Sequence, residues 1–263
     1  IIMKKDVVAG LGEIGLPIFK VFSKIYPTFG YDIDKNLMPN NPKKIESYSV
    51  RFLHICIPFN KFFLPNTLKL NKKFVPDCIV IHSTVKPETT KKLQKRINIP
   101  VIYSPTRGVH KRMTHDLKRY TKFFALDDSM KNSLSCSRNY ANLLKKSGIK
   151  LNKISNSVTL ELSKIICDTS YYGWLINYAQ MSKMIADKYA VDYDEMWTFS
   201  DEIHKFLGNR PKMFPGFIGG HCVIPNLELI HNDTLELINS LNNSYLKKVK
   251  NAKSINKKYL KKK

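Results

Sequence analysis

Three glycines near the amino terminus stand at a spacing that suits dinucleotide binding. Gly10, Gly12 and Gly15 form the pattern G-x-G-x-x-G directly after an apolar run at 7–9, and an amphipathic stretch at 16–25 follows. A strand, a glycine turn and a helix start form the context in which this pattern holds a pyrophosphate against helix N–H groups. The first glycine permits the turn, the second leaves room for the phosphates, and the third lets the helix pack on the strand. The intervening residues belong to the same expected cofactor site: Leu11, Glu13 and Ile14.

A carboxylate is expected where the second strand of such a unit ends. Asp32, in the segment GYDID at 30–34, fits this position, slightly under the usual interval of about 20 residues. An acid there accepts hydrogen bonds from both ribose hydroxyls and repels a 2′-phosphate. The sequence therefore predicts NAD as the cofactor. A glycine-rich turn in an unrelated α/β unit is the alternative interpretation.

Length and cysteine usage exclude several classes of protein. The 263 residues suffice for one large domain or for a domain with a smaller partner. The five cysteines include no C-x-x-C pair, which argues against a zinc site or a disulfide framework and favours the cytoplasm. No apolar run approaches the length of a membrane span, and no signal peptide precedes the first strand. We therefore expect neither a metal nor a membrane partner.

The formal net charge of +23 raises the question of nucleic-acid binding. Residues 245–263 alone hold nine lysines and no acid. Lysine dominates over arginine along the whole chain, which indicates a compositional bias rather than a basic binding face. We expect a solvated or weakly helical tail, no specific nucleic-acid partner, and weak attraction to polyanions at low salt.

Short apolar runs alternate with polar, helix-compatible segments through the first half. These runs occupy 50–57, 78–82, 100–103 and 121–126. Their length suits strands that are buried on both faces of a sheet. Helices are expected between them, over 86–96 and 129–146. The alternation predicts an α/β fold with a Rossmann-like, doubly wound, mostly parallel sheet.

The pattern changes near residue 157. Apolar residues recur at helical spacing over 157–190 without a proline, with Gly173 as a place where the helix could bend. Asp192 is expected to cap a further helix that ends near Phe206. A loop rich in glycine and proline follows at 208–226, and then a helix over 227–242. The expected organisation is an NAD-binding domain at 1–153, a long-helix α-helical domain at 154–243 and a basic tail at 244–263.

Several segments together resemble the UDP-glucose/GDP-mannose dehydrogenase family. They are GLGEIGLPI at 10–18, YDID at 31–34, HICIP at 54–58, HSTVKPETT at 82–90, YSP at 103–105, ELSKIICDTSYY at 161–172 and GFIGGHC at 216–222. The resemblance extends to about residue 230. It implies an NAD-binding domain, a central helical domain that dimerises, and four-electron oxidation of a sugar-nucleotide alcohol to a carboxylate in polysaccharide biosynthesis. The third domain of the family, which binds UDP, has no counterpart in this sequence.

The resemblance assigns the catalytic thiol to Cys222, in the loop that contains Gly219 and Gly220. Sulfur would attack the aldehyde to form a thiohemiacetal, hydride loss would give a thioester, and water would release the acid. The glycines before the sulfur let the substrate approach closely. A small buried thiol in a loop is the alternative interpretation.

Lys164 and Asp168 stand four residues apart, hence on one face of a helix. The resemblance makes Lys164 an oxyanion stabiliser and possible proton donor, while an ordinary helical salt bridge is the alternative. Thr84, after Ser83, matches a threonine that contacts the cofactor and a catalytic water, and Pro58 lines the nicotinamide side. For Thr84 and Pro58, a plain strand-ending turn is the alternative interpretation.

Three polar positions depart from the family pattern. Thr106 stands where the family has glutamate, Asn226 where it has aspartate, and Asp168 where it has asparagine. Because thioester hydrolysis needs a positioned base, these changes bear on the second oxidation. Arg107 follows Thr106 in the basic segment TRGVHKRMTH and is a candidate for an anionic substrate group, or part of a solvated basic loop.

Two other functions stay open. One is a two-electron hydroxyacid-type dehydrogenase in which Lys164 is the acid/base and Cys222 is idle. The other is a cofactor-binding protein without turnover. The expected partners are a nucleotide sugar or another anionic small molecule, and a second copy of the chain that packs through the long helix.

Overall fold

The computed structural model describes residues 4–39, 49–126, 130–207, 215–220, 222–229, 231 and 233–260. The chain forms two compact units, Ile1–Lys164 and Ile165–Lys263. The division falls inside a helical segment rather than at the predicted position near residue 153. Residues 208–214 and 221 of the predicted glycine- and proline-rich loop lie outside the described residues.

The first unit is built on a seven-stranded sheet in the order β2-β1-β3-β4-β5-β6-β7. The strands are β1 (Lys5–Ala9), β2 (Thr28–Tyr31), β3 (Val50–Ile55), β4 (Pro76–Ile81), β5 (Val101–Tyr103), β6 (Lys122–Leu126) and β7 (Leu151–Lys153). All neighbours pair in parallel except β5 and β6. The predicted doubly wound, mostly parallel sheet is therefore confirmed.

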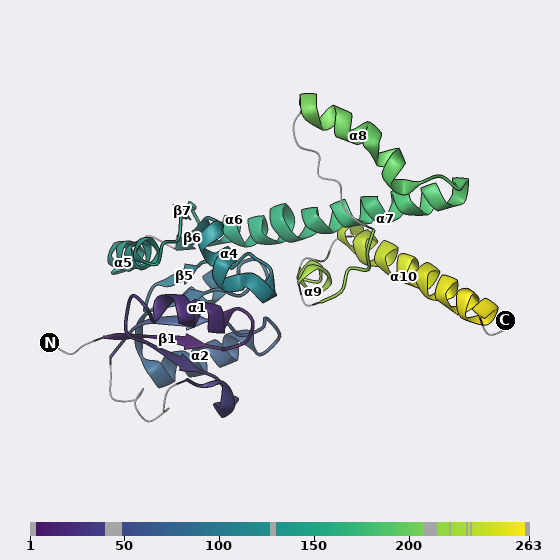
Figure 1. Ribbon diagram of the computed structural model, residues 1–263. Coiled ribbons are helices and arrows are strands. Elements are labelled where there is room, and N and C mark those ends of the chain that lie inside the picture. The colour runs from purple at the N-terminus through teal and green to yellow at the C-terminus, as the bar shows by residue number, and fades with distance from the viewer. Residues whose placement is uncertain are drawn as a thin grey trace. The chain divides into compact units, whose positions relative to one another are not determined.

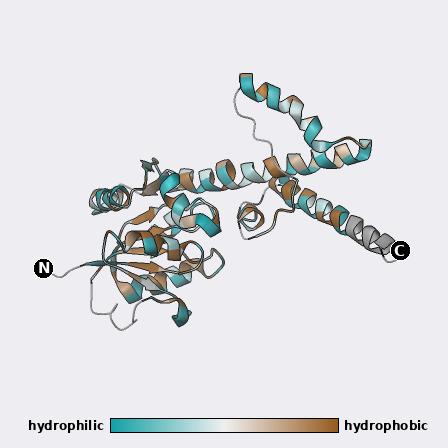
Figure 2. Ribbon diagram, viewed as in Figure 1, coloured by the Kyte–Doolittle hydropathy of each residue, from teal (hydrophilic) through white to brown (hydrophobic). Residues whose placement is uncertain are grey.

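Helices cover both faces of this sheet (Figure 1). One face packs against α1 (Gly15–Phe22), α4 (Met113–Arg119) and α5 (Ser133–Lys146), and the other against α2 (Phe63–Phe74), α3 (Thr89–Gln94) and α6 (Ser157–Leu162). Short 3₁₀ turns occur at η1 (Lys35–Leu37) and η3 (His110–Arg112). The central strands of the sheet are largely brown (hydrophobic) in Figure 2, as expected for a sheet buried on both sides.

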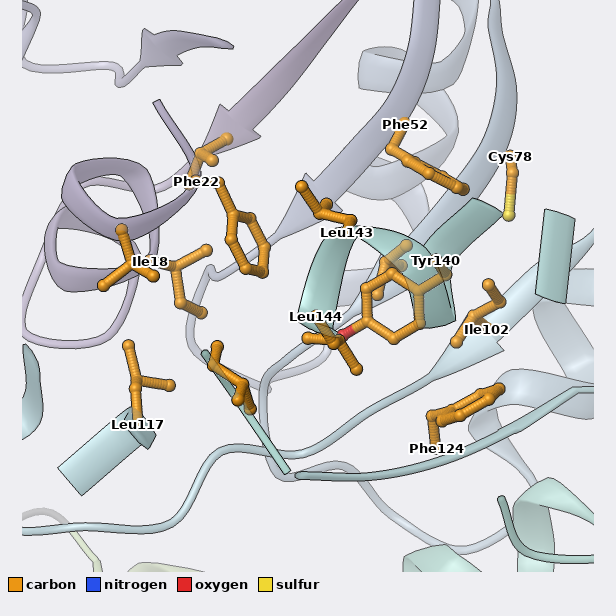
Figure 3. Packing of buried hydrophobic residues seen from close by; sticks show 14 of the residues in the cluster. Ile18, Phe22, Phe52, Cys78, Ile102, Leu117, Phe124, Tyr140, Leu143 and Leu144 are labelled. Carbon is orange, nitrogen blue, oxygen red and sulfur yellow. The ribbon is translucent and has the colours of Figure 1, made fainter. Parts of the chain in front are cut away.

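Tyr140 stands at the centre of the core under α5. Its ring makes edge contacts with Phe52 on β3 and Phe124 on β6, at centroid distances of 5.9 and 5.5 Å (Figure 3). Its hydroxyl donates to Ser104 Oγ at 2.9 Å, so the one polar atom of this buried ring is satisfied. Burying each such large side chain stabilises the fold by about 1.5–3 kcal/mol.

A buried polar chain crosses the same core. Arg51 donates two hydrogen bonds to Asp6, at 2.9 and 2.6 Å, and His54 Nε2 lies 3.9 Å from that carboxylate. His54 Nδ1 then meets His82 Nε2 at 3.0 Å. Burial lowers the pKa of both histidines, while Asp6 acts in the opposite direction on His54. The imidazoles are therefore neutral in the folded protein near neutral pH.

The second unit is helical. It begins within a π-helix, Ser163–Ser170, and continues through α7 (Tyr171–Tyr189), α8 (Tyr193–Leu207), α9 (Val223–Leu227) and α10 (Asp233–Leu260). The predicted cap is confirmed, because Asp192 Oδ1 accepts a hydrogen bond from Glu195 N at 2.7 Å at the start of α8.

The last helix differs from the one predicted over 227–242. It begins later, at Asp233, and reaches Leu260, with α9 as a separate short helix before it. The lysine-rich stretch contains neither glycine nor proline, and lysine is a good helix former, so nothing in the sequence stops the helix. Among the described residues, no helix combines the length and hydropathy needed to cross a membrane.

Candidate functional site

The three glycines in the turn between β1 and α1 differ in the space around them. Gly10 has a φ of +89°, and a Cβ there would lie 2.9 Å from the Cys56 carbonyl. A Cβ on Gly15 would lie 1.6 Å from the Gly10 oxygen, so α1 begins directly against the end of β1. A Cβ on Gly12 would meet nothing within 4 Å. Packing within the protein therefore requires Gly10 and Gly15, whereas Gly12 leaves open space at the helix start.

Asp32 follows β2 and faces this turn. Its Oδ2 accepts a hydrogen bond from Leu11 N at 2.6 Å, and its Oδ1 accepts one from Asp34 N at 3.0 Å. Each carboxylate oxygen keeps a further lone pair for a ligand hydroxyl. The acid and the glycine turn thus form one arrangement that fits the ribose and pyrophosphate of a dinucleotide.

The carboxyl ends of β1 and β3 lie side by side where the strand order reverses. From β1 the chain goes to β2 on one side and then crosses to β3 on the other. Ligands of open α/β sheets bind at such a switch point. Pro58 is exposed just beyond β3, and Ser83 Oγ beyond β4 donates to Ile57 O at 2.6 Å. Half-buried Thr84 follows, so Pro58, Ser83 and Thr84 all lie at this edge.

Thr106 has a buried partner that the sequence did not reveal. Lys122, at the start of β6, donates to Thr106 Oγ1 at 2.7 Å and to Pro105 O at 3.0 Å. Burial lowers the pKa of Lys122 to about 7, and the charges of Lys164 and Arg107 act in the same direction. In the sequence, the signal for Lys122 is that it is the one charged residue in the apolar run 121–126.

The basic segment after β5 binds its own neighbours. Arg107 Nη2 donates to Thr121 O at 3.1 Å, and its guanidinium lies 5.2 Å from the centre of the Phe123 ring. His110 Nδ1 lies 2.6 Å from Glu13 Oε2, which ties this segment to the glycine turn. Arg107 is thus held at the carboxyl edge with part of its donor capacity already used.

A buried carboxylate ties α6 to the loop after β4. Glu161 Oε1 accepts from Thr90 N at 2.9 Å and Thr90 Oγ1 at 2.6 Å, and its Oε2 accepts from Glu88 N at 2.6 Å. Burial raises the pKa of Glu161 against the effect of these hydrogen bonds. Lys164 stands three residues further along, so this contact fixes its helix relative to the sheet. Glu161 belongs to the motif at 161–172, but nothing in the sequence predicted that its carboxylate anchors α6.

Lys164 and Asp168 lie on the π-helix Ser163–Ser170. Its wider turn is seen at Ser170, whose Oγ donates to Ile165 O, five residues earlier, at 2.7 Å. Segments of π-helix are rare and occur frequently at functional sites. Both side chains are half-buried.

Cys222 lies on the second unit, directly before α9. Its side chain is exposed, and its carbonyl accepts a hydrogen bond from Asn226 N at 3.3 Å. Exposed Gly219 and Gly220 precede it, and Gly220 has a φ of +78°, which favours glycine. The second unit therefore carries Asp168, Gly219, Gly220, Cys222 and Asn226, and the first carries the other predicted site residues. Within the described residues, no group of three or more histidine, cysteine or acidic side chains could hold a metal ion.

The sheet and its covering helices define a Rossmann-like fold. UDP-D-ManNAc dehydrogenase from Pyrococcus horikoshii is similar in structure, with a TM-score of 0.76 and 17% identity, over 92% of this chain and 68% of its own. The 3-hydroxyisobutyrate dehydrogenase of Mycobacterium tuberculosis is also similar, with a TM-score of 0.65 and 14% identity, over 93% of each chain. The resemblance that the sequence motifs indicated is therefore confirmed at the level of the fold.

One curated protein is similar to this chain in sequence. Protein CapL of Staphylococcus aureus is 24% identical over an alignment of 262 positions that covers 82% of this chain. The chain spans 59% of the length of CapL. No family model matches the chain.

Proposed function

We propose that this chain is an NAD-dependent dehydrogenase that oxidises the primary alcohol of a UDP- or GDP-sugar toward the carboxylate. The observation that carries the proposal is the open space at Gly12 beside the carboxylate of Asp32, at the switch point of the sheet. The similarity in fold to a UDP-D-ManNAc dehydrogenase supports the choice of substrate.

The cofactor would lie with its pyrophosphate over Gly10, Gly12 and Gly15 and its ribose on Asp32. When bound, NAD accepts the hydride that leaves the substrate carbon. Ser83 and Pro58 hold the turns at the nicotinamide side, and Thr84 orients a water there. That water takes the proton of the alcohol, and Lys164 donates to the substrate oxygen as charge develops on it, an interaction that is worth more in a site screened from bulk solvent.

Cys222 carries the second half of the reaction. Its thiolate would add to the aldehyde carbon while Lys164 donates a proton to the oxygen, which gives a thiohemiacetal. A second NAD, held by the same residues, would supply the acceptor for the hydride that this carbon loses. The resulting thioester is cleaved by water, which releases the carboxylate and regenerates the thiol. Gly219 and Gly220 let the substrate approach the sulfur, and Arg107 and Thr106 bind the substrate.

The changed polar residues act on this last step. Water needs a base to attack a thioester, and Thr106 and Asn226 cannot serve where the family has acids. Asp168 is the carboxylate that this chain adds, so we assign it the role of the base.

The experiment is NADH formation by the purified protein with NAD and a panel of UDP- and GDP-sugars, beside Cys222→Ser. We expect two NADH per sugar in the unsubstituted protein and at most one in the variant. Two NADH from Cys222→Ser would remove the cysteine mechanism. If no UDP- or GDP-sugar in the panel is oxidised, nucleotide sugars are not the substrates of this chain.

A two-electron hydroxyacid dehydrogenase is the second candidate. The observation that favours it is the likeness to 3-hydroxyisobutyrate dehydrogenase, which covers 93% of both chains. Lys164 would then be the acid/base and Cys222 would take no part. One NADH per hydroxyacid, unchanged in Cys222→Ser and lost in Lys164→Met, would establish this function.

A cofactor-binding protein without turnover is the third candidate, and the three changed polar positions favour it. NAD binding without NADH formation on either class of substrate would establish it. For all three candidates we propose a cytoplasmic homodimer that packs through α7.

A further inference from the structure

Three buried side-chain amides lie between α7 and α10 in the second unit. Asn177 and Gln180 belong to α7 and Asn242 to α10, and each is at most 1% exposed. Asn177 Nδ2 donates to Gln180 Oε1 at 2.8 Å, and Gln180 Nε2 lies 3.3 Å from Asn242 Oδ1. Amides are costly in an apolar interior unless they form hydrogen bonds, so the partners of these three indicate what they do.

Asn242 and Gln180 bond to backbone groups of the segment 216–218, which precedes Cys222, whereas Asn177 donates to Ile238 O on α10 at 3.4 Å. Asn242 Oδ1 accepts from Ile218 N at 2.8 Å, and its Nδ2 donates to Ile218 O at 3.0 Å. Gln180 Nε2 donates to Gly216 O at 2.6 Å. Both hydrogen-bonding groups of Ile218 are thereby satisfied by one amide, as they would be in a sheet.

The other side of Cys222 is anchored to the same two helices. Val223, Ile218 and Ile238 belong to one apolar cluster. A Cβ on Gly173 of α7 would lie 3.1 Å from Val223 Cγ1 and 3.3 Å from Ile238 Cγ2, so the start of α9 approaches the helix closely at this glycine. Cys222 is thus exposed, while Ile218 before it and Val223 after it are held by the two helices.

We propose that Asn242 and Gln180 are positioning residues that set the place of the Cys222 sulfur. The inference rests on the proposed function, in which this sulfur attacks an aldehyde. Attack requires a defined approach, and a displacement of about 1 Å can lower the rate by about a hundredfold. Asn242 and Gln180 act through the loop and touch no reacting atom.

The test compares Asn242→Asp with two matched variants. The aspartate keeps the size of the side chain but cannot donate to Ile218 O. Asn243→Asp makes the same change on an exposed neighbour, whose amide donates to Asn239 of its own helix. Ile238→Val weakens the same apolar cluster without removing a hydrogen bond, and it controls for a general loss of stability.

Two readouts do not depend on turnover. The first is hydrogen exchange of the Ile218 amide, which we expect to rise about tenfold or more in Asn242→Asp. The second is alkylation of Cys222 by iodoacetamide, divided by that of Cys167, an exposed cysteine on the same unit. We expect this ratio to change about threefold or more in Asn242→Asp, and to stay unchanged in Asn243→Asp and Ile238→Val.

An unchanged ratio in folded Asn242→Asp, or an equal change in Ile238→Val, would overturn the proposal. If Asn242→Asp does not fold, Gln180→Met removes the bond to Gly216 with little change in volume and is held to the same expectation. With an active sugar substrate, kcat should fall about tenfold while the KM for NAD stays constant. If Cys222→Ser does not alter the NADH yield, the proposed cysteine mechanism is wrong, but the alkylation result still shows whether Asn242 positions the sulfur. Failure of the mechanism and failure of the positioning proposal can therefore be told apart.

Discussion

Single residues at the carboxyl edge of the sheet depend on partners that lie far away in the sequence. The predicted residue Thr106 is recognisable from its motif, but its partner Lys122 is 16 positions away and stands in an apolar strand. The three N–H and O–H donors to Glu161 come from residues more than 70 positions earlier. Spacing along the chain predicts contacts within one turn or helix. Contacts such as Lys122–Thr106 can be predicted only when the order of the strands in the sheet is known.

The buried histidines predict how stability depends on pH. Because burial lowers the pKa of His54 and His82, the unfolded chain takes up their protons first, below about pH 6.5. The free energy of unfolding should therefore fall as the pH drops below this value, by up to about 1.4 kcal/mol per pH unit for each histidine. Urea unfolding between pH 7.5 and 5.0 measures the slope.

Substitution identifies the groups responsible. The double variant His54→Leu/His82→Phe should show a clearly shallower slope, because neither side chain can take up a proton in the unfolded state. His231, which is exposed on the second unit, provides the control His231→Gln, with the slope unchanged. An equal slope in the double variant would assign the acid sensitivity to other groups.

At the scale of elements, the turn between β1 and α1 separates the demands of folding from those of the proposed NAD binding. Gly15→Ala places a methyl group on the Gly10 carbonyl oxygen and should cost at least about 3 kcal/mol of stability. Gly12→Ala meets no protein atom, so its stability should stay within about 0.5 kcal/mol of the unsubstituted protein. Its methyl group would instead occupy the space for the pyrophosphate, and the Kd for NAD should rise about tenfold or more.

Urea unfolding and calorimetric titration with NAD measure the two effects. The pair is informative because the same chemical change is made three residues apart in one turn. Normal NAD affinity in Gly12→Ala would place the pyrophosphate elsewhere.

The elements themselves were largely predictable. Apolar runs marked β3 to β6 because a sheet covered on both faces needs continuous apolar strands, and Asp192 marked the start of α8. The sequence could not separate α9 from α10, since residues 227–242 suit a helix throughout and the break depends on packing. The π-helix at Ser163–Ser170 also has no signal in local propensity, because its hydrogen bonds run to residues five positions back.

At the scale of the whole molecule, α7 presents aromatic side chains that the single chain leaves in solvent. Tyr171, Tyr172 and Tyr178 are 56%, 50% and 58% exposed, and Trp174 is 37% exposed. Large aromatic residues are enriched in protein interfaces, where they bury much area at low entropic cost. This exposure supports the proposed homodimer through α7.

Light scattering coupled to gel filtration should therefore give about twice the monomer mass of 30.4 kDa. Tyr171→Lys/Tyr172→Lys should shift the protein to the monomer mass, because four desolvated ammonium groups would face one another across a two-fold interface. Phe199→Lys, at a 79% exposed aromatic position on α8, is the matched control and should stay dimeric. A monomer in Phe199→Lys with a dimer in the tyrosine variant would move the interface from α7 to α8. NAD binding, which depends on the first unit, should be the same in all three proteins.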